Sequence, residues 1–279
     1  MIGKYINTKG RRKKIAFCFL TYEGHERNDI WVNNIKQSKN NHYFNFYVHN
    51  KNEIPEGDFL KPYEIPDKIP TEWGKISLVK ATLLLLKEAL RDPDNYYFIL
   101  VSDKCIPLYS LDYIYDLICT SNQSILDTQF GYNPDIDRVM HKRVDAIMDY
   151  IESADNFSKC SQWMCLTRMD TEFFIENDFT DFFKKCFAPD EHYFCNVLSK
   201  NKRDFISMKL NYANWYHHSD QAEIFGGKER DYPKTYHTLS LQQFDTARST
   251  GALFMRKIIS QCVICYRVLS KIYDYGKKD

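Results

Sequence analysis

The sequence predicts an α/β fold with a doubly wound, mostly parallel central sheet. Three short apolar segments have the length and the aromatic content of buried strands, and a helical pattern follows each of the first two. Strands that alternate with helices in this way pair side by side in a parallel sheet. The expected strands are residues 15–22, 44–51 and 96–103, and the expected helices are residues 30–39 and 75–91.

The rest of the chain has a less regular pattern. Residues 120–160 mix turns with charged segments, and no repeat or linker divides the chain. We therefore expect one domain over residues 1–279, with a nucleotide-binding half at 14–115 and an acceptor and catalytic half at 116–279. The further expected elements are a strand at 161–168 and helices at 173–186, 189–200 and 253–273.

The composition excludes some classes of protein. A net charge of +1 argues against a dedicated nucleic-acid binder, which usually carries a basic excess. Most of the nine cysteines lie in apolar runs, which favours free buried thiols. Cys262 and Cys265 would share the apolar face of the last helix, so they indicate core packing and no zinc or redox site.

Polar side chains follow the three expected strands. Ligands of parallel sheets bind beyond the carboxyl ends of the strands, so Thr21, Tyr22, His49, Ser102 and Asp103 are expected around one crevice. The first turn reads TYEGHER, without the glycine pattern of a dinucleotide or P-loop site. A nucleotide here must be held in another way.

A metal-dependent nucleotide-sugar enzyme would need paired carboxylates, typically Asp-x-Asp after an apolar strand. The third strand ends in Ser-Asp-Lys-Cys, which offers only Asp103. Metal dependence is therefore disfavoured. The alternative is a site made by Asp103 with Asp135 or Asp137.

Arg256 and Lys257 interrupt the apolar segment GALFMRKII. Adjacent cations in such a segment are costly unless anions meet them, and a diphosphate accepts hydrogen bonds from both. The alternative is that both extend to solvent from the start of an amphipathic helix. The residue pattern leaves both interpretations open.

The segment FAPDEHYFCNVL concentrates titratable groups at the start of an expected helix. Pro189 suits the first turn, and Asp190 and Glu191 then lie where the positive end of the helix stabilises carboxylates. Helix capping alone explains both acids. His192 fits either a base or an ordinary helix residue.

Seven segments, in order, carry a resemblance to a known family. They read IAFCFLTY, YVHNK, WGKISLVKATLLLLKEAL, YYFILVSDKCIPL, SQWMCLTR, APDEHYF and ALFMRKI, between residues 14 and 260. Together they resemble the core-2/I-branching glycosyltransferases (glycosyltransferase family 14), which are related to peptide xylosyltransferases and plant homologues. The resemblance implies a GT-A fold, a UDP-sugar donor, inversion at the anomeric carbon and no divalent metal or other cofactor.

The resemblance also implies roles for individual residues. Glu191 matches the catalytic base, Arg256 and Lys257 match the basic pair that contacts the diphosphate, and Trp215 is similar in position to a sugar-site tryptophan. A single ionised carboxylate, with a reference pKa of about 4.3, can take the proton of an attacking sugar hydroxyl. We expect donor contacts at Thr21, Tyr22, His49, Ser102 and Asp103, and acceptor contacts at Trp163 and His217.

The expected function is transfer of GlcNAc, xylose or glucose from a UDP-sugar to a glycan or protein-linked hydroxyl. The alternative is a catalytically inactive protein of the same fold that binds a glycan or nucleotide. Departures from the family pattern occur at Cys160, at residues 234–238 and over residues 125–143, where the acceptor side has no clean match.

Neither end of the chain predicts a membrane span. The apolar run near the amino end is too short, and cations interrupt the last one. The expectation is a soluble protein. Met1 and the thiol-rich core favour a cytoplasmic setting, and the abundance of Lys, Asn, Ile and Tyr suggests a viral or microbial source. A trimmed catalytic domain from the Golgi lumen is the alternative.

Overall fold

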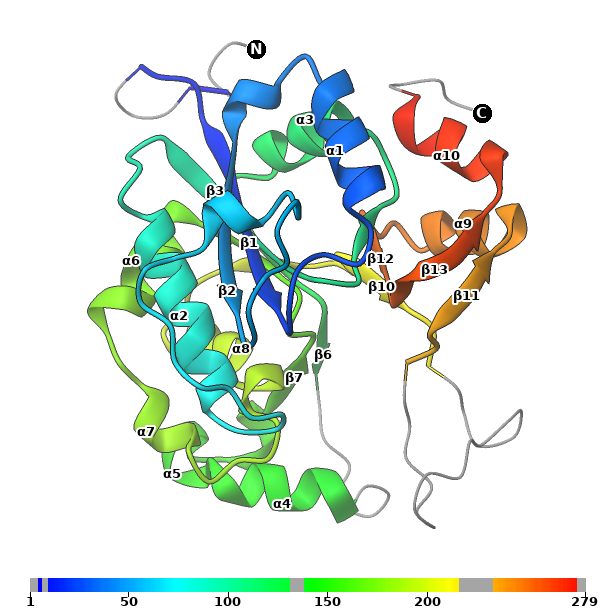
Figure 1. The fold of residues 1–279 in the computed structure, drawn as a ribbon. Helices are drawn as coiled ribbons and strands as arrows, with labels where there is room; N and C mark the ends of the chain where they lie inside the picture. The colour runs from blue at the N-terminus through cyan, green and yellow to red at the C-terminus, as the bar shows by residue number, and fades with distance from the viewer. Residues whose placement is uncertain (1–4, 7–9, 131–137, 216–232, 275–279) are drawn as a thin grey trace.

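A computed structural model of the chain describes residues 5–6, 10–130, 138–215 and 233–274. Its centre is a six-stranded sheet of order β2-β1-β3-β8-β5-β9 (Figure 1). Five strands run in one direction and β8 runs in the other, which confirms an α/β fold with a mostly parallel sheet. The strands are β1 Lys14–Thr21, β2 Phe44–Asn50, β3 Asn95–Ser102, β5 Ser124–Leu126, β8 Cys165–Thr167 and β9 Phe205–Ser207.

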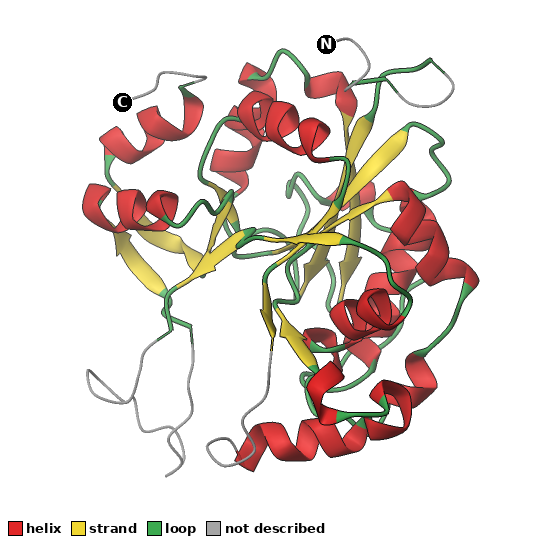
Figure 2. Cartoon of the chain, turned by 180° about the vertical axis from the view of Figure 1, so that it is seen from behind, coloured by secondary structure: helices red, strands yellow, loops and turns green. Residues whose placement is uncertain are grey.

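Helices cover both faces of this sheet (Figure 2). Side chains alternate between the faces along a strand. Thus Phe17 and Phe19 of β1 pack in one apolar cluster with Trp31 of α1, whereas Cys18 packs in another with Phe174 of α6. Burial on both sides explains the continuous apolar run of this strand. One face carries α1 Asn28–Gln37 and α3 Leu111–Ser121, and the other carries α2 Ser77–Ala89, α6 Arg168–Glu176 and α8 Tyr193–Lys200.

The elements expected in the first hundred residues are confirmed with shifts of one or two residues at their ends. The helix α3 was not among the expected elements, although its ends carry recognisable signals. The Ser110 side chain accepts a hydrogen bond from the Tyr113 N–H, and Asn122 ends the helix in the left-handed region, with φ 54°.

The predicted helix over residues 253–273 is wrong. The segment forms β12 Phe254–Arg256, β13 Ile258–Ile264 and only then α10 Tyr266–Tyr273. Pairing of β12 with β4 (Ile106–Pro107) and β10, and of β13 with β11 (Tyr236–Leu239), supplies partners that the local pattern does not reveal.

The cysteine expectations are confirmed in part. All nine thiols are free, and all but Cys265 are buried. The shared helix face of Cys262 and Cys265 is wrong, because Cys262 lies on β13 and exposed Cys265 is the residue that precedes α10.

Three more predicted elements need correction. The strand expected over residues 161–168 is confined to β8. The helix expected over 173–186 ends with α6 at Glu176, and the Asp178 carboxylate accepts a hydrogen bond from the Thr180 N–H (2.8 Å) where α7 begins. The helix expected over 189–200 is a 3₁₀ turn, η5 Pro189–Glu191, followed by α8, with His192 between them at φ −131°.

Smaller elements complete the described chain. A third apolar cluster joins β4, β11, β12 and β13 to α9 and α10, on the right in Figure 1. No helix in the described ranges is long and apolar enough to cross a bilayer. The elements not yet given bounds are α4 Arg138–Ala146, α5 Met148–Ile151, α7 Thr180–Phe183, α9 Leu241–Ser249, β6 Thr128–Phe130, β7 Ser158–Cys160, β10 Asn211–Ala213 and the 3₁₀ turns Asn41–Tyr43, Lys61–Tyr63 and Ala154–Asn156.

A buried carboxylate joins four elements on one side of the sheet. Asp170 of α6 accepts hydrogen bonds from Ser124 Oγ of β5 (2.5 Å) and Thr167 Oγ1 of β8 (3.0 Å). Its other oxygen accepts from Arg203 Nε (2.6 Å), just before β9. Asp170 is 5% exposed, so its bonds are shielded from water.

We expect Asp170→Ala to lower the free energy of unfolding by about 3–5 kcal/mol, because the change leaves a partly buried Arg203 and two hydroxyls without their partner. Urea unfolding measures the loss. Asp181→Ala is the matched control, since Asp181 is 86% exposed in its side chain, and it should change the value by less than about 0.5 kcal/mol. Equal effects of the two substitutions would contradict this role.

Candidate functional site

Strand pairing brings Arg256 and Lys257 to the carboxyl end of β3. The strand β12 pairs with β4, the short strand that begins four residues after β3 ends, through Phe254 with Pro107 and Met255 with Ile106. The Ile258 N–H then donates to the Lys104 carbonyl (3.0 Å). The basic pair therefore lies beside Asp103, at the edge of the sheet where the sequence places the site.

Charge and burial oppose one another in this cluster. Burial raises the pKa of Asp103, against Lys104, the Tyr22 N–H and Arg256, which lower it. Burial lowers the pKa of Arg256, and Asp103 is one of the charges that counter this effect. Burial, followed by repulsion from Arg256 and Lys104, lowers the pKa of Lys257 to about 8. The cations of this cluster are poorly solvated, and a bound anion would stabilise their charged forms.

Trp163 covers the guanidinium of Arg256. The Arg256 Cζ lies 4.6 Å from the centroid of the Trp163 ring, and Trp163 is 7% exposed. The Arg256 Nε is buried without a hydrogen-bond partner among the described residues. A cation–π contact attracts the guanidinium to the ring face without using its N–H donors. Trp163, expected on the acceptor side, thus contacts the residue expected at the diphosphate.

The Tyr22 side chain is accessible directly after β1. Its side chain is 56% exposed, and the Lys51 Nζ lies 5.7 Å from its ring centroid. Thr21 is buried, and its hydroxyl donates to the Glu23 carbonyl (2.5 Å). Tyr22 therefore presents an accessible ring at this edge.

His49 and Ser102 hold the loops that follow β2 and β3. His49 is completely buried and accepts a hydrogen bond at Nε2 from the Ile69 N–H (3.1 Å). Ser102 is buried, accepts from the Lys104 N–H (3.2 Å) and contacts the Cys105 Sγ. A nucleotide would reach either side chain only after these loops moved.

Trp215 follows β10, the strand that pairs with β12. Ala213 of β10 pairs with Arg256. Trp215, two residues after Ala213, forms a β-bridge with Pro233. Its side chain is 46% exposed. His217, the other expected acceptor residue, lies outside the described residues.

Glu191 lies in a second cluster, at the end of η5. Its Oε2 accepts a hydrogen bond from Arg143 Nη1 of α4 (2.8 Å) and lies 3.7 Å from the Lys159 Nζ of β7. Its side chain is 26% exposed, and Oε1 makes no hydrogen bond to the described residues. One oxygen is anchored and the other is available.

The neighbours of Glu191 are buried. His192 is 0% exposed, its Nε2 lies 3.2 Å from Arg143 Nη1 and its Nδ1 3.3 Å from the Ser158 carbonyl. Burial and then Arg143 lower the pKa of His192 to about 4, so it is a neutral structural residue with both nitrogens engaged. Burial and then Glu191 raise the pKa of Asp190 to about 7, and its Oδ1 has no partner among the described residues.

Helix capping does not explain the two acids. Helix α8 begins at Tyr193, after His192, and the structure shows no side-chain hydrogen bond that caps it. The capping interpretation of Asp190 and Glu191 is therefore wrong. Both acids lie in the separate turn η5, and α8 starts only after His192.

A short segment connects the two clusters. Lys159 contacts Glu191, and Trp163, four residues later, contacts Arg256. Four residues span at most about 14 Å even when fully extended. The Glu191 cluster and the basic pair are thus linked through one short stretch of chain that contacts both.

A profile described as Core-2/I-Branching enzyme matches residues 15–248. The chain belongs to this family. The resemblance drawn from the seven segments is confirmed, and with it the class of enzyme, a glycosyltransferase domain.

A curated relative is similar to this core-2/I-branching domain. Glycosyltransferase BC10 of Oryza sativa subsp. japonica is 29% identical over 267 residues, which cover 80% of this chain and 62% of the rice protein. The chain thus spans less than two thirds of that relative's length.

Two solved structures also match part of the chain. One is the galactosyltransferase LgtC in complex with donor and acceptor sugar analogues, at a TM-score of 0.38 and 8% identity, covering 70% of this chain and 75% of that one. The other is an active-site mutant of LgtC, also at 0.38, with 10% identity and coverage of 73% and 80%. The fold assignment rests on the sheet order and on the helices of the core-2/I-branching chain itself.

Arg143 is the site residue that the sequence analysis missed. It follows His141 and Lys142 in a basic run, which on its own indicates a solvated helix face. The sequence carries no local signal that separates Arg143 from its exposed basic neighbours. Its side chain is 12% exposed.

The described residues contain no group of three His, Cys, Asp or Glu side chains that could hold a metal ion. Asp103 lies in the basic cluster, while Asp135 and Asp137, its partners in the metal-dependent alternative, lie outside the described residues.

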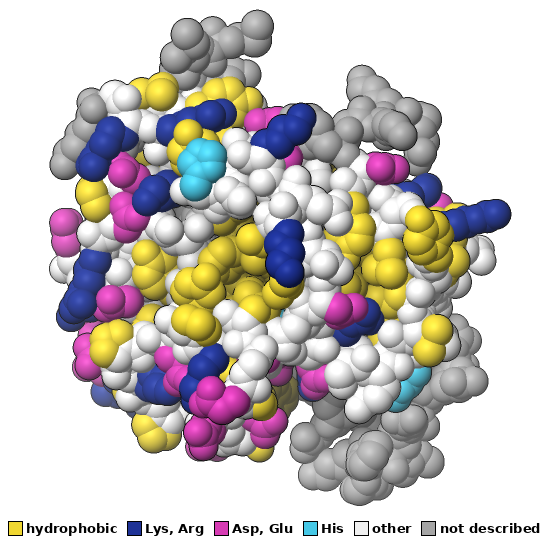
Figure 3. Space-filling model, turned by 45° about the horizontal axis from the view of Figure 1, so that its top comes forward, with side chains coloured by type: hydrophobic (Ala, Val, Ile, Leu, Met, Phe, Trp, Pro, Cys, Tyr) yellow, Lys and Arg dark blue, Asp and Glu magenta, His cyan; other side chains and the backbone are white. Residues whose placement is uncertain are grey.

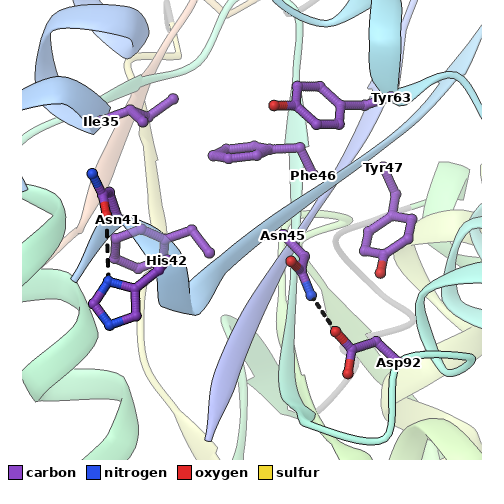
Figure 4. Close-up of a pocket in the computed structure, with 9 residues that line it drawn as sticks. Ile35, Asn41, His42, Asn45, Phe46, Tyr47, Tyr63 and Asp92 are labelled. Carbon is purple, nitrogen blue, oxygen red and sulfur yellow. Dashed lines mark hydrogen bonds between the residues drawn. The ribbon is translucent and has the colours of Figure 1, made fainter.

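A shallow pocket of about 470 Å³ lies elsewhere, along the edge strand β2 (Figure 4). Phe44–Tyr47, in the amino-terminal part of β2, line it together with Tyr63, and Asp92 lies at one end. It belongs to the opposite end of the strands from Asp103 and is separate from the site. Seen with its upper end tilted forward, the molecule shows apolar side chains near the middle of the surface and charged ones mostly around them (Figure 3).

Asp190 gives a test of this electrostatic description. Its pKa of about 7 lies above the unfolded value of 3.8, so the unfolded chain loses the proton first and stability falls as pH rises from about 4 to about 7. Asp190→Asn should remove this loss, and its stability relative to the unsubstituted chain should rise by up to about 4 kcal/mol between these pH values. Urea unfolding across this range measures it.

The control for this prediction is Asp155→Asn, at an exposed carboxylate. Its stability difference from the unsubstituted chain should be nearly constant with pH. A constant difference for Asp190→Asn as well would mean that Asp190 is ionised in the folded protein.

Proposed function

We propose that the chain transfers a sugar from a UDP-sugar to a glycan or protein-linked hydroxyl, with inversion and without a divalent ion. The observation that carries the proposal is that Arg256 and Lys257 lie beside Asp103 at the carboxyl end of β3, while residues 159–163 contact both Arg256 and Glu191. Family membership supports the reaction class. GlcNAc, xylose and glucose are the candidate donor sugars.

In the proposed reaction, Glu191 acts as the base through Oε1 while Arg143 holds Oε2. The acceptor oxygen attacks the anomeric carbon, its proton passes to Glu191, and the bond from that carbon to the diphosphate breaks with both electrons leaving on UDP. Attack opposite to the leaving group inverts the configuration. Arg256 and Lys257 stabilise the charge that develops on the diphosphate.

The donor would lie across the carboxyl ends of β1 and β3. Tyr22 offers an exposed ring to the uracil, and the basic pair offers donors to the phosphates. The sugar and the acceptor would then lie between Trp163, Trp215 and Glu191.

Glu191→Gln is the decisive substitution for this proposal. It removes the base while keeping a hydrogen-bond acceptor for Arg143, so turnover should fall by roughly 10²–10⁴ and UDP affinity should stay within about twofold. The assay is UDP release from a panel of UDP-sugars, run with and without EDTA. Glu152→Gln, at an exposed carboxylate paired with Lys200, is the control.

Two outcomes of this experiment favour other functions. Unchanged UDP release with Glu191→Gln would reject this residue as the base, and nucleotide binding without turnover in the unsubstituted chain would favour the inactive binding protein. Activity lost in EDTA and restored by manganese would favour the metal-dependent alternative.

Lys257 predicts the pH dependence of UDP binding. Its pKa of about 8 in the ligand-free protein means that the cation is lost as pH rises through this value, and an anionic ligand favours the charged form. UDP affinity should therefore fall above about pH 8, by up to tenfold per pH unit. Isothermal titration calorimetry measures it.

The matched variant is Lys257→Arg. Arginine stays protonated over this range, so its pH profile should be flat where the unsubstituted protein loses affinity. Parallel profiles for the two proteins would show that Lys257 does not meet the diphosphate.

A further inference from the structure

Two large aromatic side chains lie exposed beside the Glu191 cluster. Trp73, in the turn before α2, is 68% exposed, and Phe187, before η5, is 45% exposed. Their rings meet edge to face, with centroids 5.3 Å apart and planes at 74°. Both residues lie in or next to segments that resemble the family, and the sequence pattern assigns neither side chain a role.

The backbone beneath the two rings is fixed. The Ala188 N–H donates to the Gly74 carbonyl (3.0 Å), which ties the turn before α2 to the turn before η5. Gly74 has φ +74°, and a Cβ there would lie 2.8 Å from Phe187 Cε2. The absence of a side chain at Gly74 lets Phe187 rest on the backbone, so the aromatic surface is preorganised.

The aromatic pair is continuous with the Glu191 cluster through one residue. The Arg143 Cζ lies 5.0 Å from the centroid of Phe187, and Arg143 Nη1 lies 2.8 Å from Glu191 Oε2. A ligand that places a hydroxyl at Glu191 and extends past Arg143 would meet Phe187 and then Trp73.

Charged residues lie next to Trp73 along the chain. Glu72 and Lys75 flank the Trp73-Gly74 turn, and both are exposed and form no ion pair with the described residues. A sugar ring has an apolar face of C–H groups and a rim of hydroxyls, which match an aromatic surface and neighbouring charged groups respectively. An apolar peptide would leave these two charges without a role.

We propose that Trp73 and Phe187 form an acceptor subsite that binds a sugar unit of an oligosaccharide beyond the unit whose hydroxyl reacts. The subsite rests on the proposed transfer, since Glu191 marks where the reacting hydroxyl lies. It identifies the acceptor as an oligosaccharide chain, because a monosaccharide at Glu191 gains nothing from a ring beyond Arg143.

The test uses Trp73→Ala in the full chain, with Tyr266→Ala as the matched control at an 80% exposed aromatic on α10. The probes are immobilised di- to hexasaccharides derived from xylan, glucan and chitin, with the corresponding monosaccharides. The unsubstituted chain should bind at least one oligosaccharide, and Trp73→Ala should weaken this binding by about three- to tenfold. Tyr266→Ala should leave it unchanged, and both variants should keep the UDP affinity of the unsubstituted chain.

Gly74→Ala provides a second variant with Trp73 intact. The added Cβ displaces Phe187, so oligosaccharide binding should weaken while UDP affinity is kept. Thermal unfolding establishes that each variant is folded.

Equal binding by the unsubstituted chain and Trp73→Ala overturns the subsite, as does the absence of oligosaccharide binding or a stronger response to an apolar peptide. The proposed transfer is judged separately, by UDP release. Missing UDP release together with Trp73-dependent glycan binding rejects the transfer and leaves a glycan-binding site at Trp73 that is no acceptor subsite. UDP release with Trp73-independent binding rejects the subsite and keeps the transfer.

Discussion

The pairing of β12 with the segment after β3 is the constraint on which the site depends. It carries Arg256 and Lys257 from the end of the chain to Asp103, and no local interaction could place them there. Burial lowers the pKa of both cations, which shows that the fold bears a desolvation cost at this point. Asp103 offsets part of that cost, and an anionic ligand would offset more.

The sequence predicts the first hundred residues well because each element there carries its own signal. A continuous apolar run identifies β1, and apolar spacing of three to four identifies α2. The last part was predicted wrongly for the opposite reason. The apolar pattern of residues 253–264 fits a helix as well as a strand. These residues form strands because they pair with Ile106–Pro107 and Tyr236–Leu239.

The site divides in the same way. The sequence predicts a site that contains Asp103, Arg256 and Lys257, because one lies at a strand end and the other two match a family segment. The stacking of Trp163 on Arg256 and the contact of Arg143 with Glu191 do not follow, because each joins residues more than 40 positions apart. Such contacts are set by packing and not by any local pattern.

The residues around Glu191 set the charge near the carboxylate that is the proposed base. Burial raises the pKa of the neighbouring Asp190 to about 7, so it adds little negative charge beside Glu191 well below this pH. Glu191 then faces Arg143 and Lys159 alone, and their attraction fixes one oxygen in place. An anchored carboxylate keeps its other oxygen in a defined orientation. In the proposed transfer, a neutral Asp190 leaves the pair of adjacent acids with one charge, which matches a reaction that uses a single carboxylate.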